Sequence, residues 1–292
     1  MGAELAEAFP AARAVFERAD DVLGFSLSRL CFLGPEEELK QTQNAQPAIL
    51  VHSYAVWTLM RDGLADRVSC GAGHSLGEFT AYTAAGSLSY EDAVRLVRRR
   101  GELMAQSPEG TMAAVVGLEA EAVENICRQV CAGGEMVVAA NYNSPQQIVI
   151  SGEVAAVTRA GELAKEAGAR MVRPLAVSGA FHSPLMEDVE AGLRAELDQV
   201  TFSDPSFPII ANATAEPVNT AAQARTTLIR QLTAPVRWTQ SIQRIADLGV
   251  QNFVELGPGK VLSGLLRRID PQLQGVEVGR PDDVLRHREG ES

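Results

Sequence analysis

Hydrophobic and polar residues follow two different rhythms along this chain of 292 residues. Residues 46–61 are mostly apolar and carry a proline near their start, which predicts a buried helix with proline in its first turn. The short apolar run 68–72 is typical of a buried strand, and the break at 73–77 leads into a predicted helix at 76–85. A strand, a sharp turn and a helix in succession indicate an α/β fold.

The rhythm changes after residue 110, where shorter strands and helices alternate. The pattern predicts the order β-α-β-β-α-β, which is the ferredoxin-like arrangement. We therefore expect a ferredoxin-like subdomain at 110–178. Its six expected elements are a strand at 111–118, a helix at 119–131, strands at 136–140 and 146–151, a helix at 153–168 and a strand at 169–175.

The turn after the strand at 68–72 contains a Gly-x-Ser-x-Gly motif, with Ser75 between Gly73 and Gly77. In such a nucleophile elbow, the serine occupies a strained strand-to-helix turn and its hydroxyl projects into the site. We expect both glycines to be required because a Cβ at either position would clash. The motif alone is too short to prove a function, but its place between a strand and a helix favours Ser75 as a nucleophile.

The elbow, together with strands predicted at 207–211 and 251–255 between helices, predicts an α/β-hydrolase-like core domain with a parallel sheet. The polar segment at the C-terminus is expected to be a disordered tail. The expected units are the core at 1–109 and 179–278, the inserted subdomain at 110–178 and the tail at 279–292.

A serine nucleophile needs a base, and the chain has four histidines. His287 lies in the expected tail, His52 lies inside an apolar helix where a structural role is expected, and His74 adjoins the serine on a turn that points neighbours apart. His182 remains, in a segment between the subdomain and the next helix, and such connections often carry catalytic groups. Position and elimination therefore favour His182, whereas no carboxylate stands out as a third member.

Composition excludes several other functions. The net charge of −11 argues against nucleic acid as the main partner, because binding to a duplex depends on neutralising phosphates. The four cysteines lack zinc-type spacing and are expected to be reduced thiols, and no apolar run is long enough to span a membrane. We expect a cytoplasmic protein without a membrane partner. The basic runs, which are Arg95, Arg98, Arg99 and Arg100 and then Lys260, Arg267 and Arg268, are expected to be solvated helix faces.

Five segments occur in an order that resembles a known family. They are GHSLGEFTAY at 73–82, NSPQQIVISG at 143–152, SGAFHSPLM at 178–186, QLTAPVRWTQS at 231–241 and ELGPGKVLSGL at 255–265. Over residues 1–270 the chain is similar to the malonyl-CoA:acyl carrier protein transacylase family, which includes the discrete acyltransferases of polyketide synthases. Five ordered segments are much more specific than one elbow.

The resemblance implies a role for each matching residue. It makes Ser75 the nucleophile and His182 its base, held by main-chain groups near Gln231 rather than by a carboxylate. It makes Arg100 the clamp for the free carboxylate of a malonyl group, because a guanidinium binds a carboxylate through two parallel hydrogen bonds. Arg100 could instead be a surface arginine of the basic run. Phe181 beside the base would disfavour a branched acyl chain.

The activity implied by the resemblance is transfer of malonyl from malonyl-CoA to the phosphopantetheine thiol of acyl carrier protein. The transfer passes through a malonyl-serine ester with ping-pong kinetics. We expect no metal, no cofactor and a monomer. Fatty-acid and polyketide synthesis both remain open as the pathway. The alternatives are a serine hydrolase or thioesterase with the same elbow, and a binding module in which the elbow is only structural.

The N-terminus departs from the family pattern. Family members open with an apolar strand and a Gly-Gln-Gly-x-Gln loop before the segment that matches Met1–Leu5, and this sequence has neither. In the family that loop supplies one main-chain donor of the oxyanion hole, and the N–H of Leu76 supplies the other. We expect that Met1 is a misplaced start or a truncation.

Overall fold

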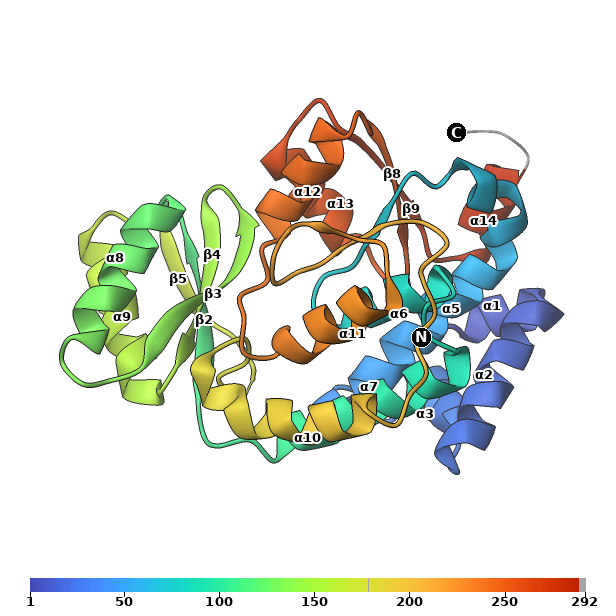
Figure 1. The fold of residues 1–292 in the computed structure, drawn as a ribbon, viewed down its shortest axis with the longest axis horizontal. Helices are drawn as coiled ribbons and strands as arrows, with labels where there is room; N and C mark the ends of the chain where they lie inside the picture. The colour runs from blue at the N-terminus through green and yellow to red at the C-terminus, as the bar shows by residue number, and fades with distance from the viewer. Residues whose placement is uncertain (178, 289–292) are drawn as a thin grey trace.

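The computed structural model describes residues 1–177 and 179–288 and has a mixed α/β fold. Figure 1 shows a smaller lobe, formed by the middle of the chain in green, beside a larger body formed by both ends. The helices of the larger body are α1 Ala3–Ala8, α2 Pro10–Leu23, α3 Leu27–Leu33, α4 Glu36–Leu39, α5 Thr42–Leu64, α6 Leu76–Ala84, α7 Tyr90–Ala105, α10 Glu187–Leu197, α11 Ala221–Arg230, α12 Trp238–Asp247, α13 Val261–Ile269 and α14 Pro281–Arg288.

The long helix α5 crosses the larger body and packs against α7. It begins at Thr42, so Pro47 lies inside the helix and the prediction of a first-turn proline was wrong. Proline has no N–H to donate to the carbonyl four residues earlier, which belongs to Gln43. Arg98 Nη1 on α7 donates to that carbonyl oxygen at 3.2 Å and so replaces the missing bond. The contact brings the polar stretch of α7 directly against α5.

The strands of the larger body lie in two separate sheets rather than in the single parallel sheet that we predicted. One sheet has the order β1-β6-β7, with β1 parallel to β6 and β6 antiparallel to β7, and the other pairs β8 and β9 in parallel. The strand bounds are β1 Gly71–Ala72, β6 Ile209–Ile210, β7 Pro217–Val218, β8 Asn252–Leu256 and β9 Gln274–Val278. The strands predicted at 68–72 and 207–211 are therefore only two residues long.

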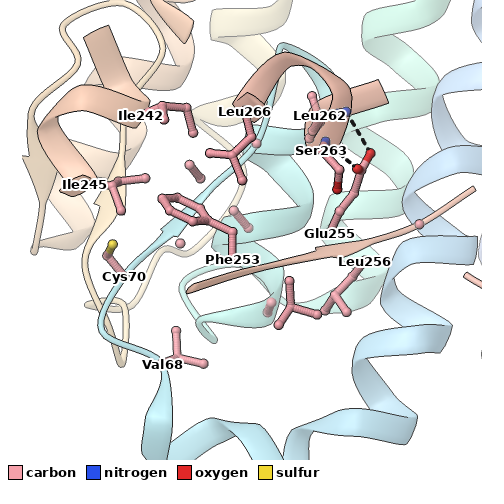
Figure 2. A pocket seen from close by; sticks show the side chains of 18 of the residues that line it. Val68, Cys70, Ile242, Ile245, Phe253, Glu255, Leu256, Leu262, Ser263 and Leu266 are labelled. Carbon is pink, nitrogen blue, oxygen red and sulfur yellow. Dashed lines mark hydrogen bonds between the residues drawn. The ribbon is translucent and has the colours of Figure 1, made fainter. Parts of the chain in front are cut away.

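A cavity of about 960 Å³ lies between the two sheets. Both β1 and β8 line it, and among the described residues no strand joins them. Figure 2 shows the apolar side chains of Cys70, Ile245 and Phe253 around this space. Farther along β8, Glu255 accepts hydrogen bonds from the backbone N–H groups of Leu262 and Ser263 in α13, which fixes that helix beside the strand.

The smaller lobe contains the six elements of the predicted β-α-β-β-α-β order. They are β2 Thr111–Val116, α8 Ala120–Cys131, β3 Val137–Ser144, β4 Gln147–Gly152, α9 Val154–Glu166 and β5 Met171–Pro174. The four strands form an antiparallel sheet in the order β3-β4-β2-β5. In Figure 1, α8 and α9 cover the face of this sheet that is turned away from the larger body.

The two faces of the small sheet follow from the alternation of side chains along a strand. Ala113 and Val115 of β2 belong to the apolar cluster under α8 and α9. Met112 and Ala114, which alternate with them, belong to a second cluster that packs against Phe181. The second face of the lobe therefore fixes the segment that carries the predicted base.

The C-terminal segment is more ordered than we expected. Residues 281–288 form α14, so the prediction of a disordered tail was wrong there, and residues 289–292 lie outside the described part of the chain. Asp283 accepts hydrogen bonds from the N–H groups of Gly279 and Arg280, which satisfies free donors at the helix start. Val284 is fully buried and Arg288 donates to the carbonyl of Leu59, so α14 is attached to α5.

Within the described residues, every helix is either too short or too polar to cross a bilayer.

Candidate active site

Ser75 forms the predicted sharp turn between β1 and α6. Its φ of 48° and ψ of −104° are strained for a residue with a side chain, and such strain is typical of functional sites. A Cβ on Gly73 would lie 1.9 Å from the carbonyl carbon of Gly77, so position 73 requires glycine. A Cβ on Gly77 would meet open space, so the prediction of a clash was right for Gly73 and wrong for Gly77.

The side chains of Ser75 and His182 are in direct contact. Ser75 Oγ lies 2.8 Å from His182 Nε2, although 107 positions separate the two residues. His182 Nδ1 lies 3.0 Å from the carbonyl oxygen of Gln231. A carbonyl can only accept a hydrogen bond, so Nδ1 carries the proton and the neutral ring presents Nε2 as an acceptor to the serine hydroxyl. This is the arrangement that a general base requires.

His182 is neutral at physiological pH. Burial and, less strongly, the positive charge of Arg100 lower the pKa of its imidazole to about 3. The side chain is 4% exposed, so water does little to stabilise an imidazolium. The ring is therefore in its neutral form, in which Nε2 can accept a proton from Ser75.

Arg100 is the most unusual side chain of the site because it is large, charged and only 1% exposed. Its Nη1 donates to Gln46 Oε1 at 2.6 Å, and its Nη2 donates to Ser75 Oγ at 2.9 Å and to Gln231 Oε1 at 3.2 Å. All three acceptors are neutral oxygens, and Nε has no partner among the described residues. Burial lowers the pKa of the guanidinium to about 10, which still leaves it charged at neutral pH.

The other members of the same basic run behave as surface residues. Arg95, Arg98 and Arg99 are partly exposed and form ion pairs with neighbouring carboxylates. The prediction of a solvated helix face is therefore right for Arg95 and Arg99 and wrong for Arg100. It is right only in part for Arg98, whose guanidinium also donates to Gln43 and Asn44 of α5. The difference arises because Arg100 lies on the face of α7 that packs against α5 and the elbow.

Gln231 connects the predicted residues with one another. Its Nε2 donates to the backbone oxygen of Ser75 at 2.9 Å and to Glu78 Oε2 at 2.7 Å, while its Oε1 accepts from Arg100. Sequence reasoning missed Glu78 and also Gln46 and Asn212, which contact this group of residues. No local pattern distinguishes them, because their partners are 54 to 153 positions away.

Leu76 and Phe181 are the chain neighbours of Ser75 and His182. Leu76 is the first residue of α6, so its N–H has no acceptor within the helix and can face a ligand on Ser75. The ring of Phe181 packs against the smaller lobe and is so close to Gly179 that a Cβ there would lie 2.4 Å from it. The other histidines take no part: His74 bonds Asn143 at 2.8 Å, and His52 is buried in α5.

The large cavity between the two sheets is distinct from this cluster. It is lined by Gly73, Leu76 and Gly77 of the elbow, but Ser75, His182 and Arg100 are not among its lining residues. The contacts among Ser75, His182 and Arg100 therefore lie where α6, α7 and the His182 segment meet. The cavity lies apart from them, beside β1.

Comparisons with known proteins agree with the resemblance of the sequence segments. The family model described as "Acyl transferase domain" matches residues 1–277. The malonyl CoA-acyl carrier protein transacylase of Bacillus subtilis is 44% identical over 288 residues, which cover 97% of this chain and 90% of the relative. The protein of the same name from Haemophilus influenzae is 43% identical over 282 residues, with 95% and 90% covered.

Solved structures agree over almost the whole fold. An acyl carrier protein S-malonyltransferase from Vibrio cholerae matches with a TM-score of 0.94 and 40% identity, covering 97% of this chain and 94% of that one. A malonyl-transacylase solved in complex with a type II polyketide synthase acyl carrier protein matches with a TM-score of 0.95 and 40% identity, with 99% and 94% covered.

Proposed function

The chain belongs to the acyl transferase domain family, and from this membership we propose that it moves a malonyl group from malonyl-CoA to the phosphopantetheine thiol of an acyl carrier protein. The observation that carries the proposal is the position of Ser75 Oγ, which contacts His182 Nε2 and Arg100 Nη2 at the same time. A base and a fixed cation therefore meet at one nucleophile.

The first half-reaction forms the serine ester. Ser75 Oγ attacks the thioester carbonyl of malonyl-CoA while His182 Nε2 accepts the hydroxyl proton. The N–H of Leu76 at the start of α6 donates to the oxyanion that develops on the carbonyl oxygen. The carbon–sulfur bond then breaks, and the thiolate of coenzyme A leaves with the proton from His182. The product is malonyl-Ser75.

The second half-reaction reverses these roles. The thiol of the carrier's phosphopantetheine gives its proton to His182 and attacks the ester carbonyl, and the bond to Ser75 Oγ breaks with return of the proton to the serine. Because coenzyme A leaves before the carrier reacts, the kinetics are ping-pong. His182, held by the Gln231 carbonyl, acts in both half-reactions, and this scheme uses no carboxylate as a third member.

Arg100 selects the acyl group. A malonyl unit carries a free carboxylate that an acetyl unit lacks, and a guanidinium can bind it through two parallel hydrogen bonds. Arg100 is buried and charged, and in the described structure its hydrogen bonds go only to neutral oxygens. Among the residues that the structure describes, no hydrogen-bonded anion neutralises the guanidinium, so it can bind an anionic ligand. Phe181, adjacent to the base, disfavours the extra methyl group of methylmalonyl.

The proposal extends to the architecture. We assign residues 1–109 and 179–278 to an α/β-hydrolase-like core and residues 110–178 to an inserted ferredoxin-like subdomain. The strand–elbow–helix at Ser75 supports the first assignment, and the strand order β3-β4-β2-β5 supports the second. We further expect a monomer that works in the cytoplasm, where its four cysteines, none of which forms a disulfide, stay reduced.

A loading assay distinguishes transfer from hydrolysis. The protein is mixed with an acyl carrier protein in its phosphopantetheine form and with malonyl-, methylmalonyl- or acetyl-CoA, and the carrier and free acids are quantified. We expect malonyl-carrier as the main product, with little loading from the other donors. Rapid release of free malonate without carrier loading would instead identify a hydrolase or thioesterase.

A further inference from the structure

Asn212, which follows β6, contacts the elbow on both sides of His74. Its side-chain Oδ1 accepts from the N–H of Ser75 at 2.7 Å, and its Nδ2 donates to the carbonyl oxygen of Gly73 at 2.8 Å. The residue is fully buried, so these bonds do not compete with water. One amide therefore fixes the backbone before and at the nucleophile, where the strained φ of Ser75 must be held by its surroundings.

Glu78, in the first turn of α6, connects Asn212 with Gln231. Its Oε2 accepts from the backbone N–H of Asn212 at 3.1 Å and from Gln231 Nε2 at 2.7 Å. The side chain is fully buried, and Oε1 has no hydrogen-bond partner among the described residues. A carboxylate in such surroundings is costly for stability, so its presence calls for a role beyond packing.

The bond from Glu78 determines how Gln231 faces the site. Because Gln231 Nε2 donates to Glu78 and to the Ser75 carbonyl, its Oε1 is turned toward Arg100 Nη2. The backbone carbonyl of Gln231 also holds His182 Nδ1. The contacts thus continue from Asn212 through Glu78 and Gln231 to the base and the guanidinium.

We propose that Asn212 and Glu78 are positioning residues for the transfer reaction, Asn212 for the backbone of the nucleophile and Glu78 for the Gln231 amide that orients Arg100 and His182. This inference rests on the proposed function. Neither side chain contacts the oxygen of Ser75 that reacts, so each acts through another residue. Small displacements of a reacting atom lower rates strongly, by about 100-fold for 1 Å in general experience.

Two measurements on each variant test the proposal. The first is the rate at which phenylmethanesulfonyl fluoride modifies Ser75: the serine oxygen bonds to sulfur, fluoride leaves, and the proton passes through His182 to water. This probe has no carboxylate and needs no carrier. The second is malonyl loading of the carrier, resolved into kcat and KM. Circular dichroism and thermal unfolding report whether each variant is folded.

The variants are Asn212→Ala, Glu78→Ala and Glu78→Gln, with Thr83→Val as the matched control. Thr83 lies buried on the same helix as Glu78. Among the described residues its hydroxyl bonds only the Phe79 carbonyl, outside the positioning contacts. We expect Asn212→Ala to slow sulfonylation and kcat by about 10- to 100-fold with KM changed less than about threefold. We expect Glu78→Ala to lower kcat similarly and Glu78→Gln, which keeps an acceptor oxygen, to recover most of it. Thr83→Val should stay within about twofold.

The outcomes separate the inference from the proposed function. Folded Asn212→Ala and Glu78→Ala variants with the wild-type kcat would overturn the inference even if malonyl is loaded. A wild-type protein that is sulfonylated at Ser75 but loads no malonyl would overturn the proposed function, while the sulfonylation rates would still decide the role of Asn212. If Asn212→Ala does not fold, the isosteric Asn212→Asp replaces it: it loses the donor to Gly73, and an unchanged sulfonylation rate would contradict the proposal.

Discussion

Arg100 Nη2 lies 2.9 Å from Ser75 Oγ, so the fixed positive charge of the site touches the nucleophile itself. A carboxylate bound at Arg100 would therefore lie close to the acyl carbon on Ser75, as in a malonyl group, in which one carbon separates the two. The same charge stabilises an ionised oxygen on Ser75 and destabilises a positive charge on His182. Together with burial, it keeps the His182 ring neutral. Under the proposed function, this contact would relate selection of the substrate carboxylate to proton transfer at Ser75.

Replacing Arg100 with alanine should separate malonyl from acetyl transfer. Loss of a buried guanidinium–carboxylate pair costs about 3 kcal/mol or more, so kcat/KM for malonyl transfer should fall by at least about 100-fold. Acetyl transfer, which has no carboxylate to bind, should fall much less. Steady-state rates with both donors provide the measurement.

The control for this substitution is Arg99→Ala. Arg99 neighbours Arg100 in sequence but is partly exposed and pairs with Glu196 at 3.2 Å. Its loss should change either rate by less than about threefold, as is usual for a surface ion pair. Equal losses of malonyl and acetyl transfer in Arg100→Ala would show that Arg100 does not bind the carboxylate.

Replacing His182 with alanine should slow acylation of Ser75 by about 10²- to 10⁴-fold, the usual contribution of a general base. The pre-steady-state rate of coenzyme A release reports this step. His52→Ala in α5 is the matched control, because that histidine is buried but contacts neither Ser75 nor Arg100 in the described structure. A variant at position 182 with the wild-type release rate would exclude His182 as the base.

The pH dependence of kcat/KM should reflect the lowered pKa of His182. A base that loses activity on protonation, with a pKa of about 3 instead of 6.5, works unchanged as the pH falls from 8 to 5. Burial is the main cause of the lowered pKa. The charge of Arg100 and, less strongly, His74 lower it as well, while the hydrogen bond to the Gln231 carbonyl raises it. We therefore expect no acid limb near pH 6.5 for the His182 step. Glu78→Gln serves as the control because it removes the carboxyl group that contacts Gln231. A loss of activity near pH 6.5 in both wild type and Glu78→Gln would show that the His182 imidazole titrates normally.

The two glycines of the elbow should differ in their tolerance of alanine. Gly73→Ala places a Cβ 1.9 Å from the backbone of Gly77 and should lower the free energy of unfolding by about 3 kcal/mol or more. Gly77→Ala meets open space inside α6 and should be neutral or stabilising by up to about 1 kcal/mol. Urea denaturation of both variants measures the difference. Equal stabilities would mean that the elbow relaxes around a new side chain.

The sequence predicted features that depend on neighbours in the chain. The six elements of the smaller lobe follow from short apolar runs and helical segments that succeed one another. The strand β2 is one unbroken apolar run, because Ala113 and Val115 face one buried cluster and Met112 and Ala114 face another. The elbow at Ser75 was visible because its two glycines and its serine lie within five consecutive positions. The helix at 281–288 was missed because its polar composition hides the contacts of Val284 and Arg288 with the rest of the fold.

Several features that depend on distant contacts could not be predicted from local patterns. Arg100 stands in a polar run, and only the packing of α7 on α5 shows that it is buried. Pro47 could lie inside α5 only because Arg98, on another helix, donates to the carbonyl that proline leaves free. The contacts of Asn212 with Gly73 and Ser75 span more than 130 positions, and no local pattern indicates them.

The most direct test of the account is to identify the covalent intermediate and follow its fate. The protein is incubated with malonyl-CoA, the modified residue is identified by mass spectrometry of its peptides, and carrier with a free phosphopantetheine thiol is then added. We predict one malonyl group on Ser75 that disappears as malonyl-carrier forms, and no adduct on Ser75→Ala. An adduct on another residue, or carrier loading by Ser75→Ala at the wild-type rate, would contradict the account.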